Sequence, residues 1–242
     1  MKDRPALLRE LGEARSIFIR FALLLFALAS YMLLAGTPSP ATRLFTVMKN
    51  SLVPPEVSII SLGPLSPFIA PISIAFMTAF IISFPYFLFS LMRYISPALY
   101  DKERRSLSFL FFSSTSLFFL GCIFAYFILI PYTLATLYSF AVPLGVTPFF
   151  SLDAFIATVF GLTVSTGIAF LVPIIMRVLS AAGIVPATVW RTHWRAAMLI
   201  IVVFSALITP DGSGVTMVIL SIPLLILYGA GVLLSSRAHV DK

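Results

Sequence analysis

Long apolar blocks, separated by short polar connections, dominate this chain of 242 residues. A helix that crosses a bilayer core of ~30 Å needs roughly 20 apolar residues. Six blocks are candidate spans, and they cover residues 17–36, 68–92, 107–130, 154–179, 196–209 and 215–234. The pattern predicts an all-α integral membrane protein, with a single membrane domain over residues 1–242.

The fifth block is short, because residues 196–209 give only about 21 Å at helical rise. It is either a re-entrant hairpin or a true span that recruits His193 and Trp194 or thins the bilayer locally. We favour a true span, because the distribution of Lys and Arg is one-sided only with six crossings. Pro210 and Asp211 open a strong turn signal, so we expect a final pair of short spans, the fifth and the sixth.

Basic residues fall almost entirely on one side of this predicted topology. Of the 16 Lys and Arg residues, all but Arg43 and Lys49 lie near the termini or in the second-to-third and fourth-to-fifth connections. The positive-inside rule therefore places both termini in the cytoplasm, in a multi-pass protein of the cytoplasmic membrane. Although the net charge is +7, cations spread along a membrane face argue against nucleic acid as a partner.

Composition narrows the functional class. Hydrophobic residues make up 60% of the chain and charged residues 10%, whereas soluble domains have about 25% charged residues. This excludes a disordered chain and an ordinary soluble enzyme. Cys122 is the only cysteine, and His193 and His239 lie far apart, so we expect no metal and no cofactor. The central parts of most spans lack ionisable residues, which argues against a self-contained ion-coupled transporter.

The acidic residues have ordinary structural interpretations. Asp153 follows Ser151 and is expected to cap a helix, and Asp211 is expected in a turn. Glu10, Glu13 and Glu103 have basic neighbours in sequence, and such exposed pairs contribute only about 0–1 kcal/mol.

Prolines recur inside the predicted spans. Pro71, Pro85, Pro173 and Pro223 are internal, and Pro131 is expected to close the third span. Each removes a backbone donor and bends its helix, which predicts a concave bundle. Alternatively, these prolines reflect only the higher frequency of Pro in membrane helices.

The connection before the third predicted span contains Pro97-Ala98-Leu99-Tyr100-Asp101-Lys102-Glu103-Arg104. This segment is similar to the signature P-x-L-Y-x-x-E-R of the TatC family, the multi-spanning receptor subunit of the twin-arginine protein translocase, and it is the most specific of several matches. The weaker matches are Leu8-Arg9-Glu10-Leu11, Ser66-Pro67-Phe68, Phe124-Ala125-Tyr126-Phe127 with Pro131, Thr209-Pro210-Asp211, and Ile222-Pro223-Leu224 with Tyr228.

The resemblance implies a receptor without catalytic residues that binds signal peptides carrying two consecutive arginines. Guanidinium offers a planar fork that carboxylates accept bidentately, so Glu10 and Glu103 are each expected to take one arginine. The implied signal-peptide contacts are Glu10, Glu103, Arg104 and Tyr94. The implied structural or partner contacts are Leu99, Tyr100, Tyr126, Pro85 and Asp211.

The resemblance also implies the partners and the energy source. It implies single-span TatA-type and TatB-type proteins, twin-arginine precursors, the lipid bilayer, further copies of this chain, and export of folded proteins driven by the proton motive force. Three positions depart from the family pattern. Gly12 replaces an Arg, Gly229 replaces a frequent Glu, and Leu171 replaces a polar residue before Val172-Pro173. Leu171 bears on how partner helices dock.

Two other functional classes remain open from the sequence. A six-span small-molecule permease would give substrate flux in proteoliposomes that contain this chain alone. An intramembrane enzyme would need a nucleophile and base, or metal ligands, at membrane depth, and no such set is apparent.

Overall fold

The computed structural model describes residues 4–53, 57–95, 107–141, 143, 145, 149–211 and 214–240. Within these ranges, the side chains of residues 4–11, 13, 14, 95, 107 and 237–240 are not described. The described chain is mostly helical, as the sequence predicts. Its other regular structure is one pair of three-residue strands, β1 (Ser58–Ile60) and β2 (Phe149–Ser151).

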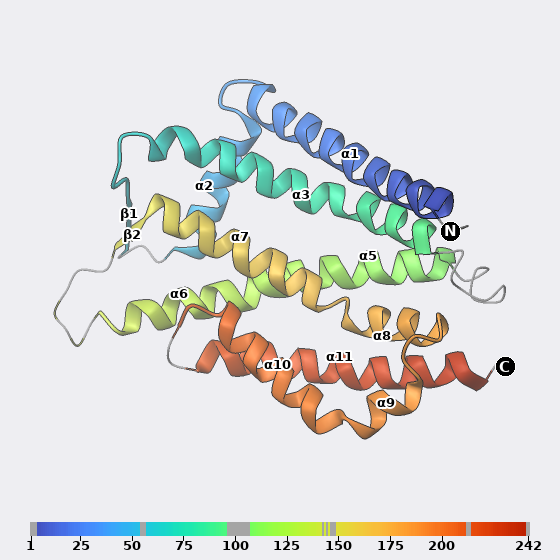
Figure 1. Ribbon diagram of the computed structural model, residues 1–242. Coiled ribbons are helices and arrows are strands. Elements are labelled where there is room, and N and C mark those ends of the chain that lie inside the picture. Colours follow the sequence, from blue (N-terminus) through green and yellow to red (C-terminus); the bar gives the residue numbers. More distant parts are fainter. Residues whose placement is uncertain are drawn as a thin grey trace.

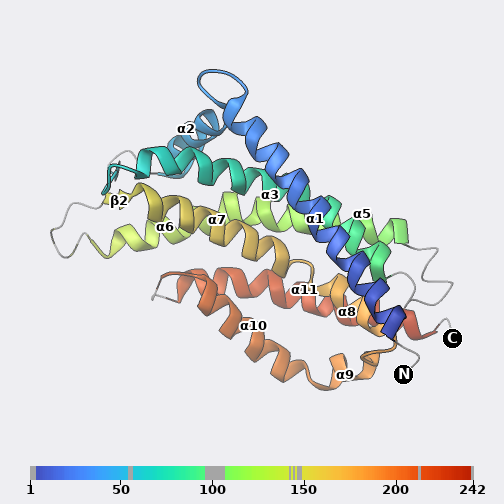
Figure 2. The ribbon, with the colours of Figure 1, turned by 45° about the horizontal axis from the view of Figure 1, so that its top comes forward.

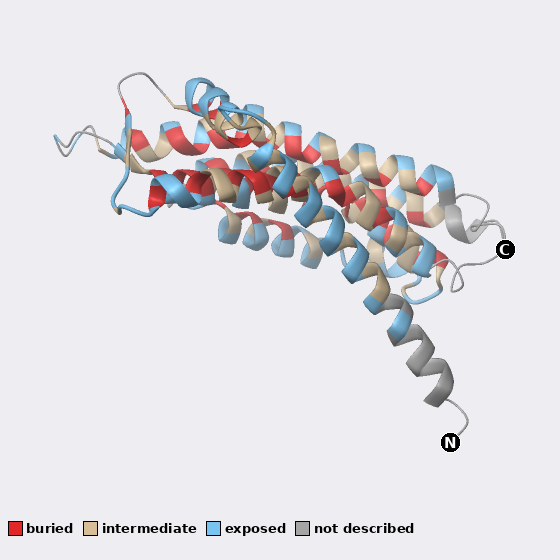
Figure 3. Cartoon of the chain, turned by 90° about the horizontal axis from the view of Figure 1, so that it is seen from above, coloured by how far each residue is buried: buried red, intermediate tan, exposed pale blue. Residues whose placement is uncertain are grey.

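Helical segments run back and forth along one bundle, from α1 (Arg4–Leu34) to α11 (Val215–Val240) (Figure 1). Those between are α3 (Ser66–Ile95), α5 (Leu107–Phe124), η2 (Ala125–Leu129), α6 (Ile130–Ser139), α7 (Leu152–Ala169), α8 (Val172–Ala181) and α10 (Trp194–Ile208). The ends of α3, α8 and α11 lie toward one end of the bundle, and α1 starts toward the same end, although it slants away from the other helices when the bundle is seen from above (Figures 1, 2 and 3). We call this the basic end, after its arginines, and the opposite end the strand end, after β1 and β2.

Five helical stretches of the described chain are long and apolar enough to cross a membrane, and α10 is a shorter apolar helix. Helix α10 begins at Trp194, two residues before the expected start at residue 196, and ends at Ile208. The sixth segment is not short. Helix α11 has 26 residues, because its polar C-terminal part continues the helix beyond the apolar run.

Pro131 does not close the third segment, contrary to the expected boundary at residue 130. The helix widens into the π-turn η2, in which the Ile130 N–H donates to the Ala125 carbonyl, and then continues as α6 to Ser139. Proline cannot donate to the carbonyl four residues earlier and clashes with it, and a wider turn accommodates both effects. The third segment is therefore one helix with a local bulge.

The fourth segment is broken where proline was expected to bend it. Helix α7 ends at Ala169 and α8 begins at Val172, with Pro173 in its first turn. Proline fits the first turn of a helix, where its missing N–H would have no partner anyway. By contrast, Pro71 and Pro85 lie inside a continuous α3.

The strand end is built by elements that the apolar pattern did not predict. Helix α2 (Pro40–Leu52) is capped by Ser39, whose hydroxyl accepts from the Thr42 N–H. Strand β1 then pairs in parallel with β2, with Ser58 opposite Phe149. Residue Ser151 ends β2 and caps α7 by accepting from the Ala154 N–H at 3.2 Å. The cap of α7 is thus Ser151 and not Asp153.

The core lies in the middle of the bundle and leaves α1 largely uncovered (Figure 3). Only 6% of the most apolar stretch of α1 is buried within the chain, whereas 61% of the corresponding stretch of the α7–α8 segment is buried. Helices α5 and α7 approach closely at Gly121 and Gly167, and a Cβ on Gly121 would lie 2.9 Å from the Gly167 Cα. Small residues at such crossings let helix backbones approach each other in membranes.

A hydrogen bond joins the first turns of α3 and α7 at the strand end. The Ser66 hydroxyl donates to Asp153 Oδ2 at 2.6 Å, and Ser66 is buried while Asp153 is exposed. We expect Ser66→Ala to lower the free energy of unfolding by about 1 kcal/mol. A double-mutant cycle with Asp153→Ala in detergent should give a coupling energy of similar size. Strictly additive effects would contradict the pairing.

Candidate functional site

The basic end gathers the elements that carry the sequence-predicted peptide-binding residues. Helix α3 ends at Ile95 and α5 begins at Leu107, so the connection that contains Glu103, Arg104, Leu99 and Tyr100 starts and finishes at this end. These four residues lie outside the described residues. Helix α1 begins at the same end, so the backbone of Glu10 lies in its N-terminal turns, although its side chain is not described.

Tyr94 lies in the last turn of α3 and is 36% exposed. It lines a hollow of about 380 Å³ between α1 and α3. The polar residues that line this hollow are Ser16, Arg20, Tyr86, Ser90, Arg93 and Tyr94. Apart from Tyr94, none of this group stands out as a site in the sequence, where Arg20 and Arg93 serve only as topology signals. The spacing of these residues within each helix is visible in the sequence, but the packing of α1 on α3 that brings them together is not.

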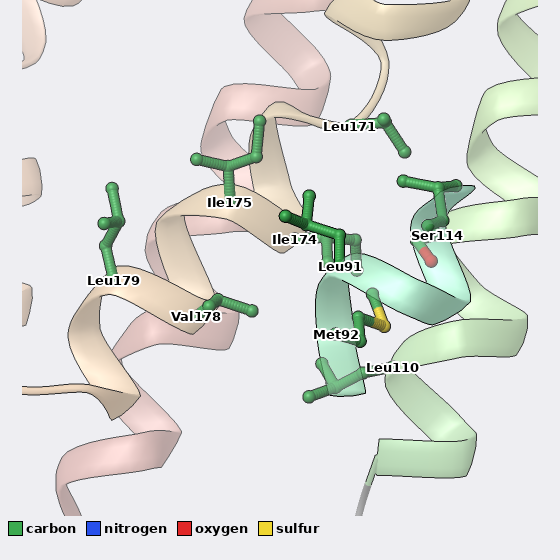
Figure 4. Close-up of a pocket in the computed structure, with 10 residues that line it drawn as sticks. Leu91, Met92, Leu110, Ser114, Leu171, Ile174, Ile175, Val178 and Leu179 are labelled. Atoms are coloured by element: carbon green, nitrogen blue, oxygen red, sulfur yellow. The ribbon is translucent and has the colours of Figure 1, made fainter. Parts of the chain in front are cut away.

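An apolar cavity of about 240 Å³ lies beside this end, where α3, α5 and α8 meet (Figure 4). It is lined by Leu88, Leu91, Met92, Leu110, Ser114, Leu171, Ile174, Ile175, Val178 and Leu179. The hydroxyl of Ser114, its one polar side chain, donates to the Phe111 carbonyl at 2.9 Å. Leu171, which replaces the polar residue of the family pattern, is 5% exposed and points into this apolar region.

A cation–π contact and an aromatic stack join the helices that surround the cavity. The guanidinium of Arg177 on α8 lies 5.8 Å from the ring centroid of Phe109 on α5. A cation over an aromatic face is attracted by the ring quadrupole, so this contact joins α8 to the first turn of α5. Phe84 of α3 stacks on Phe118 of α5 with ring centroids 4.1 Å apart. These contacts join α3, α5 and α8, the helices that line the cavity.

Two of the remaining sequence-predicted contacts, Tyr126 and Asp211, lie away from the basic end. The Tyr126 hydroxyl is 2.7 Å from Ser51 Oγ, which joins η2 to α2. Asp211 lies in the connection between α10 and α11 at the strand end and is buried, with 6% of its surface exposed. Pro85 lies inside α3. The structure thus separates Tyr94 from Tyr126 and Asp211, whereas Pro85 lies on the same helix as Tyr94.

Neighbouring hydrogen bonds fix the short helix α9 (Ala187–Thr192) against α8 and α11. Trp190 Nε1 donates to Ser180 Oγ at 3.0 Å, and the Tyr228 hydroxyl donates to the Trp190 carbonyl at 2.6 Å. Tyr228 is one of the residues that carried the family resemblance, and here it has a structural contact. No cluster of three or more His, Cys, Asp or Glu side chains that could hold a metal occurs among the described residues.

Comparison with known proteins identifies the family. The family model described as Sec-independent protein translocase protein (TatC) matches residues 7–223, which is most of the chain. The chain belongs to the TatC family. TatC of Aquifex aeolicus (strain VF5) is 37% identical over 205 residues, covering 84% of this chain and 85% of the relative. TatC of Cenarchaeum symbiosum (strain A) is 36% identical over 200 residues, covering 81% and 75%.

A solved structure shares the fold. The crystal structure described as the twin arginine translocase receptor TatC superposes with a TM-score of 0.79 and 33% sequence identity. The match covers 95% of this chain and 99% of that chain. A second crystal structure of the receptor, in DDM, gives the same TM-score at 34% identity. The chain is thus a multi-pass membrane protein with the TatC fold, and its family is a translocase component and not a family of catalysts.

Proposed function

We propose that this chain is the twin-arginine signal-peptide receptor and core scaffold of a translocase that exports folded proteins. The observation that carries the proposal is the family match over residues 7–223 together with the shared fold of the solved receptor. The chain acts by binding and positioning, with no bond-making chemistry of its own. The basic end faces the cytoplasm, because its described charged side chains are all arginines.

Recognition of the diarginine motif rests on two carboxylates at the basic end. Glu10 is carried by the start of α1, and Glu103 by the connection between α3 and α5. Because α1 begins toward the end of the bundle at which α3 ends, we expect a single short leader to reach both carboxylates. Each guanidinium donates two parallel hydrogen bonds to a carboxylate, a geometry that an ammonium group cannot reproduce.

The apolar part of the leader has a matching surface next to these elements. The cavity between α3, α5 and α8 is lined almost wholly by aliphatic side chains (Figure 4). An apolar segment that follows the arginines gains free energy by leaving water for such a surface, at about 25 cal/mol per Å². We expect Tyr94 in the last turn of α3, and Arg104 in the following connection, to contact the leader as well.

Transport of folded cargo needs further subunits. A folded domain of 100 residues has a radius of gyration of about 13 Å, whereas six helices of ~10 Å diameter in a ring leave a hole of only about 10 Å. The described helices are also packed through large, fully buried side chains such as Phe118, Phe155 and Ile74. TatA-type and TatB-type single-span proteins, further copies of this chain and the proton motive force supply the conduit and the energy.

Site-specific crosslinking tests the proposal. A photoreactive group at Tyr94 should crosslink to a precursor with a twin-arginine leader, in membranes that contain the full chain. A leader with Lys-Lys in place of Arg-Arg should bind about tenfold more weakly, because it keeps the charge and loses the bidentate fork. Equal crosslinking by the two leaders would contradict the proposed recognition. Flux of a small substrate through proteoliposomes of this chain alone would favour a permease instead.

A further inference from the structure

The hollow between α1 and α3 is a built polar site. On α3, Tyr86, Ser90, Arg93 and Tyr94 recur at intervals that place them on one face of a helix. On α1, Ser16 and Arg20 are four residues apart and face the same hollow of about 380 Å³. Neighbouring aromatic contacts fix the two helices, with Phe21 and Phe87 at 5.1 Å between ring centroids. The polar groups are therefore held together by helix packing.

The chemistry of the lining favours an anion with several oxygens. Two guanidinium groups and four hydroxyls can all donate hydrogen bonds, and guanidinium has no acceptor. The described lining contains no carboxylate. The two acidic side chains that the structure describes, Asp153 and Asp211, lie at the strand end. A phosphate would satisfy both arginines, because arginine binds phosphate oxygens bidentately.

The position of the two arginines indicates a lipid and not a dissolved ion. The candidate membrane span of α1 starts at Arg15, so Arg20 lies about 7.5 Å inside this span at helical rise. Arg93 lies next to the end of the candidate span of α3. Long basic side chains at this depth extend to the headgroup level. Apolar side chains beside the hollow are exposed, with Phe18 at 61% and Phe89 at 49%. The site therefore opens next to a lipid-facing surface.

We propose that this hollow binds the headgroup of an anionic phospholipid, with the phosphate between Arg20 and Arg93 and the acyl chains along Phe18 and Phe89. The bound lipid lowers the positive charge beside Tyr94. A cationic leader that approaches the basic end then meets less repulsion. The lipid site stands on its own lining residues and does not depend on the role of Glu10 or Glu103.

Lipid-dependent stability tests the site. The full chain is placed in nanodiscs of phosphatidylcholine alone, or of phosphatidylcholine mixed with phosphatidylglycerol. Its unfolding temperature is measured in both, and native mass spectrometry identifies the lipid that it retains. We expect phosphatidylglycerol to raise the unfolding temperature of the wild type and to co-purify with it. Arg20→Gln and Arg93→Gln should each weaken phosphatidylglycerol binding about fivefold, which corresponds to the usual contribution of one basic residue at an anionic surface.

Arg195→Gln is the matched control, because Arg195 is an exposed arginine at the same end that does not line the hollow. It should bind phosphatidylglycerol as the wild type does. The variants should unfold like the wild type in phosphatidylcholine alone, which separates loss of lipid from loss of fold. Equal binding by wild type and the Arg20→Gln/Arg93→Gln double variant would overturn the proposal. It would also be overturned if inorganic phosphate alone, added to phosphatidylcholine nanodiscs, stabilised the wild type as strongly as phosphatidylglycerol.

Discussion

Replacing Glu103 by Ala is expected to weaken binding of a twin-arginine leader peptide by about 30-fold. The variant leaves one guanidinium of the leader without its carboxylate, and removal of one partner from a close charge pair typically costs 2–5 kcal/mol. We take the lower part of that range, because a pair near the cytoplasmic surface is partly screened by solvent. Fluorescence anisotropy of a labelled leader, with the full chain in nanodiscs, measures the affinity.

Single-lysine leaders locate the arginine that Glu103 accepts. If Glu103 binds the first arginine, replacing that arginine of the leader by lysine should cost little further affinity for Glu103→Ala. Replacing the second arginine by lysine should cost the leader as much affinity for Glu103→Ala as it does for the wild type. Glu10→Ala should show the opposite preference. Asp153→Asn is the control, because Asp153 lies at the strand end. Full affinity of Glu103→Ala for the Arg-Arg leader would reject the paired-carboxylate mechanism.

Replacing Gly121 by Ala is expected to lower the free energy of unfolding by about 2–3 kcal/mol. The new Cβ would lie 2.9 Å from the Gly167 Cα and 2.9 Å from the Thr166 carbonyl oxygen, both of them backbone atoms of α7. Because backbone atoms cannot move aside as a flexible side chain can, the two helices must separate. Overpacking of a close contact typically costs 1–3 kcal/mol.

Gly161 provides a control on one of the same two helices. A Cβ there would have no atom within 4 Å, so Gly161→Ala should leave stability unchanged or raise it by up to about 1 kcal/mol through helix propensity. Unfolding in mixed micelles, followed by circular dichroism, compares the two variants. If both alanines had the same effect, the close approach of α5 and α7 would not control the stability of the bundle.

The alternation of apolar blocks predicted the helices because burial in lipid demands long apolar runs with internal backbone hydrogen bonds. It did not predict α2, since the residues 40–52 mix polar and apolar positions and are too few to cross a bilayer. It also did not predict the pairing of Ser58–Ile60 with Phe149–Ser151, because that pairing joins segments far apart in the sequence. Such pairing depends on the helices that bring the two segments together.

Residues of the candidate site were predictable where they form a short sequence motif, and not where they come together only on the surface of the folded protein. Glu103 and Glu10 were found from short sequence signatures, and their role stays a prediction. The grouping of Arg20 with Arg93 was missed, because it arises only when α1 packs on α3. Asp211 was expected in a turn between the last two spans, and its burial was not predicted, because burial depends on how the helices pack around the connection between α10 and α11.

The π-turn η2 changes how positions on α6 should be read. A π-turn takes one residue more than an α-turn, so it rotates everything that follows by about 100° relative to an uninterrupted helix. A helical wheel drawn through residues 107–139 as one helix would therefore assign the wrong faces beyond Leu129. Cysteine scans or spin-label pairs along this segment need two separate wheels, one for each side of the bulge.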